Sequence, residues 1–203
     1  MSVLPPLASV ADLAAMLNRT FTAAQEAQAQ ALLDQASSIV RSYLRQDITR
    51  ATTTDTFTLR RADPVQHRCG GVVTLPQRPV VDIVSVSVNG TATSDWWQDG
   101  NDLLLRSPAW THPPAAHAPP QVEVTYTHGW DRVPGDITAI VMQAATRVMV
   151  NPSGIRSETV GGESVTYLVP STGEFLGVLL SRTEMKALDR YRRTSGTVAV
   201  RRR

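Results

Sequence analysis

The 203-residue sequence has little of several residue types, and each shortage excludes something. A single cysteine, Cys69, excludes an internal disulfide bond, which fits a reducing compartment. No apolar run approaches the roughly 18 residues that a membrane span needs. Residues 1–13 lack the basic and apolar regions of a signal peptide, so we expect neither secretion nor membrane insertion.

Signatures of catalysis and of cofactor binding are also missing. The sequence has no phosphate loop and no GxGxxG motif, and residues 161–164 do not make the nucleophile elbow of a hydrolase. His67 and Cys69 are too few and too close for a zinc site, which needs about four ligands. We therefore expect no catalytic residue, no metal ion and no cofactor.

The residues around Trp96 come nearest to a ligand site. Asp95, Asp99 and Asp102 have the spacing of a calcium loop but lack its closing glutamate, so turn residues are the simpler interpretation. Trp96 and Trp97 could stack a ligand. The simpler interpretation is that one tryptophan packs in a small core and the other lies at the rim of that core. An enzyme with an unrecognised site here stays open as a third class of function.

Charge is distributed unevenly along the chain. Residues 1–181 carry 12 arginines and 16 acidic residues, net −4, whereas residues 182–203 carry eight basic and two acidic residues, net +6. Lys186 is the one lysine. A mildly acidic body with a basic tail is typical of proteins that bind nucleic acid or an acidic protein surface through that tail.

The clearest helical period covers residues 22–44. Thr22 and Gln25 make a capping box at its start. The apolar stripe that follows consists of Leu32, Leu33, Ala36, Ile39, Val40, Tyr43 and Leu44. The first half mixes alanine with glutamine, so it is either a solvent face of good helix formers or a face that packs on a neighbouring copy. The candidate residues for contact with such a copy are Ala24, Gln28 and Ala31.

Two more helices are predicted beside this one. Ser9 caps a short N-terminal helix, and residues 136–150 repeat apolar residues at i, i+3, i+4 and i+7. We expect helix 136–150 to pack on helix 22–44. The first two helices do not make a DNA reader, because a recognition helix needs Arg, Asn or Lys near its start.

The residues between these helices have the period of strands. Predicted strands cover residues 53–59, 72–75, 80–88, 103–105 and 122–126. Asn89-Gly90 predicts a hairpin, with Trp96 and Trp97 on the returning strand, and Asp99-Gly100 predicts a second tight turn. The proline-rich residues 108–120 cannot form an inner strand. The fold class is therefore α+β: a small helical bundle with an inserted antiparallel sheet or barrel.

The C-terminal quarter is predicted as an extended arm followed by a helix. The β-rich run 164–169 could add a strand to a neighbouring copy, with Val165 and Tyr167 as candidate contact residues. Ser181 and Glu184 make a second capping box, which opens a helix to about Arg193. That helix either closes the chain's own core or presents side chains to a partner. Its candidate contact residues are Leu188, Arg190, Tyr191, Arg192 and Arg193.

These predictions divide the chain into four parts. Residues 1–52 are the N-terminal part of the helical bundle and residues 53–128 the β-rich insert. Residues 129–152 complete the bundle, and residues 153–203 form the arm, the last helix and the basic tail.

Six segments follow one another in a set order along the chain. They are ADL at 11–13, LDQASSIVRSY at 33–43, VTYTHGW at 124–130, VPGDI at 133–137, NPSGIRSE at 151–158 and GGESVTY at 161–167. In this order and spacing the chain resembles the head–tail connector, or adaptor, proteins of long-tailed double-stranded DNA bacteriophages. None of the segments is a catalytic signature, so the resemblance rests on their order.

The resemblance implies a structural virion protein without an active site. Such proteins form a ring, commonly of twelve copies, that docks on the portal and extends the DNA channel toward the stopper and tail. It implies three protein partners, namely other copies of the chain, the portal, and a stopper or tail-completion protein, and genomic DNA that passes without sequence reading. It places the chain at the head–tail interface of the virion, after assembly in the host cytoplasm, and makes the last helix a candidate portal contact. The alternative is a nucleic-acid-binding packaging factor that uses the basic tail.

Overall fold

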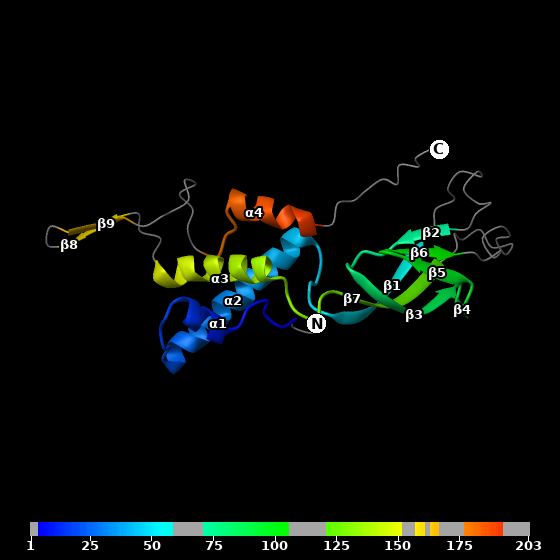
Figure 1. Ribbon diagram of the computed structural model, residues 1–203, viewed down its shortest axis with the longest axis horizontal. Coiled ribbons are helices and arrows are strands. Elements are labelled where there is room, and N and C mark those ends of the chain that lie inside the picture. Colours follow the sequence, from blue (N-terminus) through cyan, green and yellow to red (C-terminus); the bar gives the residue numbers. More distant parts are fainter. Residues whose placement is uncertain are drawn as a thin grey trace. The chain divides into compact units, whose positions relative to one another are not determined.

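The computed structural model describes residues 4–58, 71–105, 121–151, 157–160, 163–166 and 177–192. The fold is α+β, as predicted, and the chain divides into two compact units (Figure 1). The helical unit comprises residues 1–46 and 133–203, and the β unit comprises residues 47–132. The β unit is thus an insertion between two parts of the helical unit.

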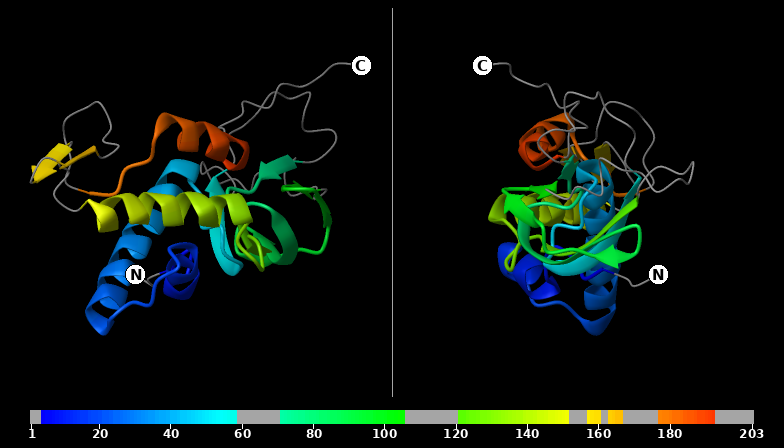
Figure 2. Two further views of the ribbon diagram at one scale, coloured as in Figure 1. Left: turned by 60° about the vertical axis from the view of Figure 1, so that its left-hand side comes forward. Right: turned by 90° about the vertical axis from the view of Figure 1, so that its right-hand side faces the viewer.

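The helical unit is built on two long helices that pack on each other, as predicted. Its helices are α1 (Val10–Met16), α2 (Ala23–Leu44), α3 (Gly135–Val150), α4 (Arg182–Leu188) and the 3₁₀ helix η3 (Asp189–Tyr191). α1 lies below α3 and α4 lies above it in both Figure 1 and Figure 2. Among the described residues, no helix combines the length and the apolar character needed to cross a membrane.

The ends of α2 follow from local chemistry. The Thr22 side chain accepts from the Gln25 amide and the Gln25 side chain accepts from the Thr22 amide, which confirms the predicted capping box. Arg45 then adopts a left-handed conformation with φ 58°, and the helix ends there. The buried stripe begins at Ala29, one turn earlier than the pattern predicted, because the first half of α2 also meets the core.

Ser37 in α2 is fully buried, which the apolar pattern did not predict. Its hydroxyl accepts from the Leu7 amide at 2.9 Å and donates to the Leu33 carbonyl at 2.6 Å. Both capacities of the hydroxyl are used, so its burial carries no unpaired polar group. Through this contact the segment before α1 is fixed to α2.

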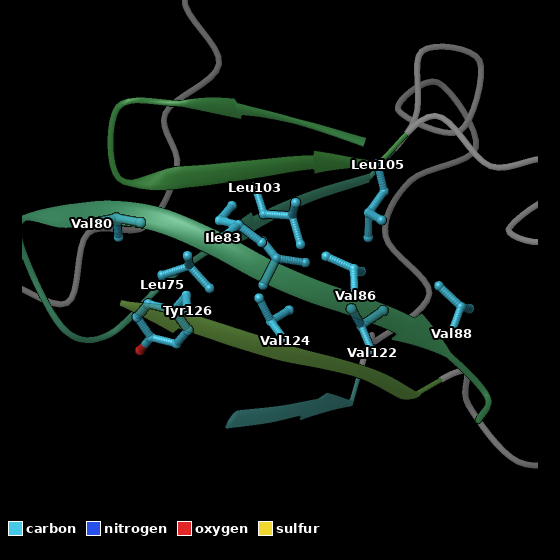
Figure 3. Packing of buried hydrophobic residues seen from close by; sticks show 11 residues of the cluster. Leu75, Val80, Ile83, Val86, Val88, Leu103, Leu105, Val122, Val124 and Tyr126 are labelled. Atoms are coloured by element: carbon cyan, nitrogen blue, oxygen red, sulfur yellow. The ribbon is translucent and has the colours of Figure 1, made fainter. Parts of the chain in front are cut away.

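The β unit contains two antiparallel sheets with a shared apolar core. One sheet has the strand order β1-β7-β3-β4 and the other β2-β6-β5. The strands are β1 (Ala51–Thr58), β2 (Gly71–Thr74), β3 (Val80–Val88), β4 (Thr91–Ala92), β5 (Trp96–Asp99), β6 (Asp102–Leu105) and β7 (Gln121–His128). Figure 3 shows buried side chains from both sheets meeting between them, among them Ile83, Val124 and Leu103.

The hairpin predicted at Asn89-Gly90 is present, since Val88 pairs directly with Thr91. Both turn residues have positive φ, 50° and 80°, as a two-residue hairpin turn of this kind requires. The returning strand β4 is only two residues long, however, so the prediction that Trp96 and Trp97 lie on it is wrong.

Trp96 and Trp97 lie instead on β5 in the other sheet. Trp96 packs against the apolar core, and its indole N–H donates to the Thr93 carbonyl at 3.1 Å. The chain therefore changes sheets between residues 93 and 95, because that crossing brings an aromatic ring to the core. Trp97 is exposed, so the expectation of one core tryptophan and one rim tryptophan is confirmed.

Gly129 sets the path by which the chain leaves the β unit. It has φ +86°, and a Cβ atom there would lie 2.5 Å from the Thr49 carbonyl oxygen. The next residue, Trp130, donates its amide to the Ile48 carbonyl at 2.9 Å and accepts from the Arg50 amide at 3.0 Å. The entering and leaving segments of the β unit thus run side by side, at a spacing that glycine permits.

The described part of the arm is a small hairpin of its own. β8 (Ser157–Val160) pairs antiparallel with β9 (Glu163–Thr166). The sequence predicted an extended run available to a neighbour, but it did not predict that this run first pairs within its own chain.

Candidate functional site

The residues predicted to meet partners fall in three places: the end of the last helix, the exposed face of α2, and the β8–β9 hairpin. The first is a network of polar contacts that we call the C-terminal cluster. Its members are Tyr43, Gln46, Asp136, Asp189, Arg190, Tyr191 and Arg192.

Within the C-terminal cluster, side chains of η3 form polar contacts with the start of α3 and with the residues that end α2. Arg190 forms an ion pair with Asp136, and the Tyr191 hydroxyl donates to the other Asp136 oxygen at 3.0 Å. The Gln46 side-chain amide donates to the Tyr191 carbonyl at 2.7 Å. Two predicted contact residues, Arg190 and Tyr191, are therefore engaged within the chain.

The aromatic ring of Tyr43 completes the C-terminal cluster. Its hydroxyl donates to Asp189 at 2.6 Å, and this hydrogen bond raises the pKa of Tyr43 above its ordinary value. The Arg192 guanidinium lies over the same ring, 4.9 Å from its centroid. The basic tail thus starts from a defined place beside α2. Arg193, also a predicted contact, lies outside the described residues.

A bidentate ion pair between Arg147 and Glu184 connects α4 to α3. Arg147 donates to both Glu184 oxygens at 2.7 and 3.0 Å, and to the Leu179 carbonyl at 2.8 Å. Burial of Glu184 raises its pKa, but the hydrogen bonds from Arg147 and the Ser181 amide outweigh burial and hold the pKa below its ordinary value. The carboxylate therefore stays ionised and holds the helix.

Leu188 on α4 is 0% exposed and belongs to the core of the helical unit. The sequence left open whether this helix closes the chain's own core or presents side chains to a partner. Leu188 closes the chain's own core, so in this conformation it is not available as an apolar anchor for a partner. Arg190 and Arg192 are exposed on the same stretch. Their contact with a portal stays a prediction.

The second place is the alanine–glutamine face of α2. Ala24, Gln28 and Ala31 are all exposed on it, so the face is open for a neighbouring copy. Beside it lies a hollow of about 580 Å³ between the α1–α2 turn, the start of α2 and the end of α3. Its lining comprises Leu17, Asn18, Arg19, Thr20, Phe21, Gln25, Gln28, Met149 and Val150.

The apolar part of this hollow was missed by sequence reasoning. Val150 is 55% exposed at the end of α3, and Leu17, Phe21 and Met149 line the hollow with it. The signal was in the sequence, since apolar residues continue to the very end of helix 136–150. Large apolar side chains gathered at one end of a unit indicate a contact surface.

The third place is the β8–β9 hairpin. Val165 lies in β9, opposite Glu158 in β8, while Tyr167 lies outside the described residues. The role of Val165 and Tyr167 at a ring interface stays a prediction.

The described residues contain no cluster of metal-ligating side chains. In these ranges no three His, Cys, Asp or Glu side chains lie close enough to hold a metal ion. His67, Cys69, His112 and His117 fall outside them. Asp99 and Asp102 pair across the turn between β5 and β6, as turn residues do.

Two buried polar side chains of the β unit belong to its core. The Tyr126 hydroxyl donates to Asp55 at 2.6 Å, and burial first, then this hydrogen bond, raises the pKa of Tyr126. His128 is 0% exposed, and burial lowers its pKa although Asp47 and Asp55 act in the opposite direction. Burial therefore favours the neutral imidazole near pH 7.

No family model matches the sequence, and no curated protein matches it. Solved structures do match it. A chain from the neck of an empty gene transfer agent particle, computed with C6 symmetry, aligns with TM-score 0.58 and 17% identity over 98% of this chain and 96% of that one.

Two further solved structures align with this chain over the same fractions, 98% of this chain and 96% of the other. A chain from the neck of the native particle, computed with C12 symmetry, has TM-score 0.54 and 16% identity. A chain from the virion of the native particle has TM-score 0.57 and 15% identity. Over nearly its whole length, the protein therefore has a fold similar to that of chains in these particles, two of them from the neck.

Proposed function

We propose that this protein is a structural subunit of the neck of a phage-like particle, where copies form a ring that docks on the portal and extends the DNA channel toward the stopper and tail. The observation that carries the proposal is the likeness over 98% of this chain and 96% of the neck chains. Those necks were computed with C6 and C12 symmetry, which favours a ring of six or twelve copies.

The surfaces of the helical unit support a ring. A closed ring needs two different faces on each copy, because one face meets the other face of the next copy. The exposed alanine–glutamine face of α2 allows a close approach of another helix, and the adjoining hollow with exposed Val150 offers apolar area. These supply one side of such an interface.

The charge distribution supports passage of DNA and docking on a protein. Residues 1–181 carry 12 arginines against 16 acidic residues, and this net negative charge disfavours tight binding of DNA phosphates. The basic tail is suited to an acidic surface of the portal. The C-terminal cluster fixes where that tail begins.

The test is the assembly state of the full chain, alone and mixed with the portal protein of the same particle. Size-exclusion chromatography with light scattering and negative-stain microscopy should show annular particles with sixfold or twelvefold symmetry. A strictly monomeric protein in both settings would contradict the proposal.

A packaging factor that binds nucleic acid is the second candidate, and the basic tail is the observation that favours it. Deletion of residues 194–203 separates the two. Loss of salt-dependent DNA binding would favour the packaging factor, whereas loss of portal docking with unchanged DNA binding would favour the neck subunit.

A further inference from the structure

Among the described residues, strand β1 is an edge strand with little of the usual protection. Its one charged residue, Asp55, accepts from the Tyr126 hydroxyl. The strand pairs with β7 alone among the described residues, and the pairing runs without interruption from Ala51 to Thr58. The strand contains no proline and no lysine. Proteins usually protect an edge of this length with such residues, with a bulge or with a covering segment, because its free N–H and C=O groups can pair with another strand.

The outer face of the same sheet is a row of hydroxyl groups. Alternate residues of β1 are exposed threonines, and two of them reach across to β7: the Oγ1 atoms of Thr52 and Thr127 are 3.0 Å apart, and those of Thr54 and Thr125 are 2.9 Å apart. In the next strand, Ser85 is paired with Thr125. Cross-strand threonine and serine pairs of this kind stabilise neighbouring strands.

In the β8–β9 hairpin, too, serine or threonine positions alternate with other residue types along each strand. Ser157 is opposite Thr166 and Thr159 is opposite Ser164, while the positions between them are occupied by glutamate and valine. Two strands of four residues are marginally stable in water by themselves. Both strands also have an outer edge that pairs with nothing among the described residues.

We infer that the β8–β9 hairpin of one copy adds to the β1 edge of a neighbouring copy, so that the four-stranded sheet continues across the subunit boundary. The inference rests on the proposed ring. Donor and acceptor are different surfaces, so the contact repeats head to tail around a closed ring and covers the β1 edge of every copy. Among the described residues of one chain the hairpin and β1 are not paired with each other, and the occupant that we infer is therefore a second copy.

The side-chain pattern supports this particular pair of edges. Addition in a register that aligns the alternating positions would set Thr159 or Ser164 opposite the threonine positions 54 and 56. A shift by one residue would place glutamate and valine opposite the same positions, so the register is specified by the alternation. The other edge segments match less well, since β2, β5 and the part of β3 that is not paired with β4 present valine or tryptophan at exposed positions.

Disulfide trapping between two differently tagged full-length proteins tests the inference, with Cys69→Ser as the background. One protein carries an acceptor cysteine in β1 and the other a donor cysteine in the hairpin. The acceptors are Thr54→Cys and Thr56→Cys, the donors are Thr159→Cys and Ser164→Cys, and the matched control acceptor is Ala92→Cys on β4, at the opposite edge of the sheet. Paired strands lie about 4.8 Å apart, within reach of a disulfide.

We expect at least one β1–hairpin combination to give several-fold more mixed disulfide than the Ala92→Cys control. Rings without this excess would overturn the inference and leave the proposed function standing, whereas absence of rings counts against the proposed function. No excess in any fraction, ring or monomer, would also overturn the inference. A third result would also overturn it: a single protein that carries both the β1 cysteine and the hairpin cysteine forms a disulfide within one chain, while the mixture of the two differently tagged proteins forms none.

A backbone substitution provides a second readout. Thr159→Pro removes a backbone donor from β8 and should reduce ring yield several-fold, whereas Thr159→Ala keeps the backbone and should assemble nearly as the parent does. Circular dichroism and tryptophan fluorescence check that both variants keep the folded units. Equal ring yields for the two variants would overturn the inference.

Discussion

The two units of the molecule are stabilised in different ways. The β unit is closed by an apolar core between its sheets and by the tight backbone crossing at Gly129. The helical unit also has an apolar core, which includes Leu188, but it is closed in addition by ion pairs between segments far apart in sequence, such as Arg147 with Glu184 and Asp136 with Arg190. It also carries the exposed alanine–glutamine face and the hollow. The comparison indicates that stability depends mainly on apolar packing and backbone fit in the β unit, and on apolar packing together with ion pairs in the helical unit.

The distribution of tryptophan makes this comparison measurable. Trp96, Trp97, Trp110 and Trp130 all lie within residues 47–132, so tryptophan fluorescence reports on the β unit. Circular dichroism at the helical minimum reports on the helical unit, which contains every described α-helix. A substitution in one unit should therefore move one signal and leave the other.

The largest effect is expected for Gly129→Ala in the β unit. The new Cβ would meet the Thr49 carbonyl at 2.5 Å in a backbone with φ +86°, so the free energy of unfolding should fall by at least about 3 kcal/mol. Urea unfolding followed by fluorescence measures it. Gly90→Ala is the control, because it has φ +80° but nothing within 4 Å, and about 1–2 kcal/mol is expected. Equal losses in the two variants would show that the crossing is not tight.

Leu188→Ala should have the next largest effect, on the helical unit. Its side chain is 0% exposed, so a cavity in the core should cost about 2–4 kcal/mol in the transition followed by circular dichroism. Leu179→Ala, at a leucine that is 48% exposed, should cost less than about 0.5 kcal/mol. If the fluorescence transition shifted as much as the helical one, the two units would not be independent.

Glu184→Gln weakens the tie between α4 and α3. Because the Arg147 side chain is 31% exposed and partly solvated, a loss of about 1–3 kcal/mol is expected rather than the full cost of breaking a buried pair. The native pKa of Glu184 lies below its ordinary value, so its contribution is present above pH 4.5 and is lost as pH falls through the native pKa.

Helical unfolding measured against pH should therefore show a smaller acid-induced loss in Glu184→Gln than in the parent protein. Lys186→Gln on the same helix is the control, since Lys186 is exposed. The account of this tie would be contradicted if both variants lost stability equally.

The smallest effect concerns the pH dependence of the β unit. Burial lowers the pKa of His128 in the folded state, so below about pH 6.5 the unfolded chain binds a proton that the folded chain does not. Stability of the β unit should therefore fall as pH drops below about 6.5 toward the folded-state pKa of His128. His128→Leu should flatten that slope in the fluorescence transition. If the slope of stability against pH were unchanged in His128→Leu, the pH dependence would come from another titratable group.

Local chemistry made part of the fold predictable. The capping boxes at Thr22 and Ser181, the strand at residues 80–88 and the turn at Asn89-Gly90 all depend on residues close in sequence, and all are confirmed.

Contacts between distant residues were not predictable. The change of sheets at Trp96 depends on a core assembled from several strands, and the burial of Leu188 depends on where α4 meets α3 and α2. No local pattern distinguishes a leucine that fills its own core from one that anchors a partner. The same limit applies to the candidate interface residues Ala24, Gln28 and Ala31, whose exposure is visible in one chain although their partner is not.

A symmetry-averaged electron microscopy reconstruction of the intact particle tests the central proposal most directly. The account predicts a closed ring of this chain between capsid and tail, with the alanine–glutamine face of α2 buried against the next copy and the C-terminal tail directed at the portal. A particle with no such ring, or a ring in which Ala24, Gln28 and Ala31 face solvent, would contradict it.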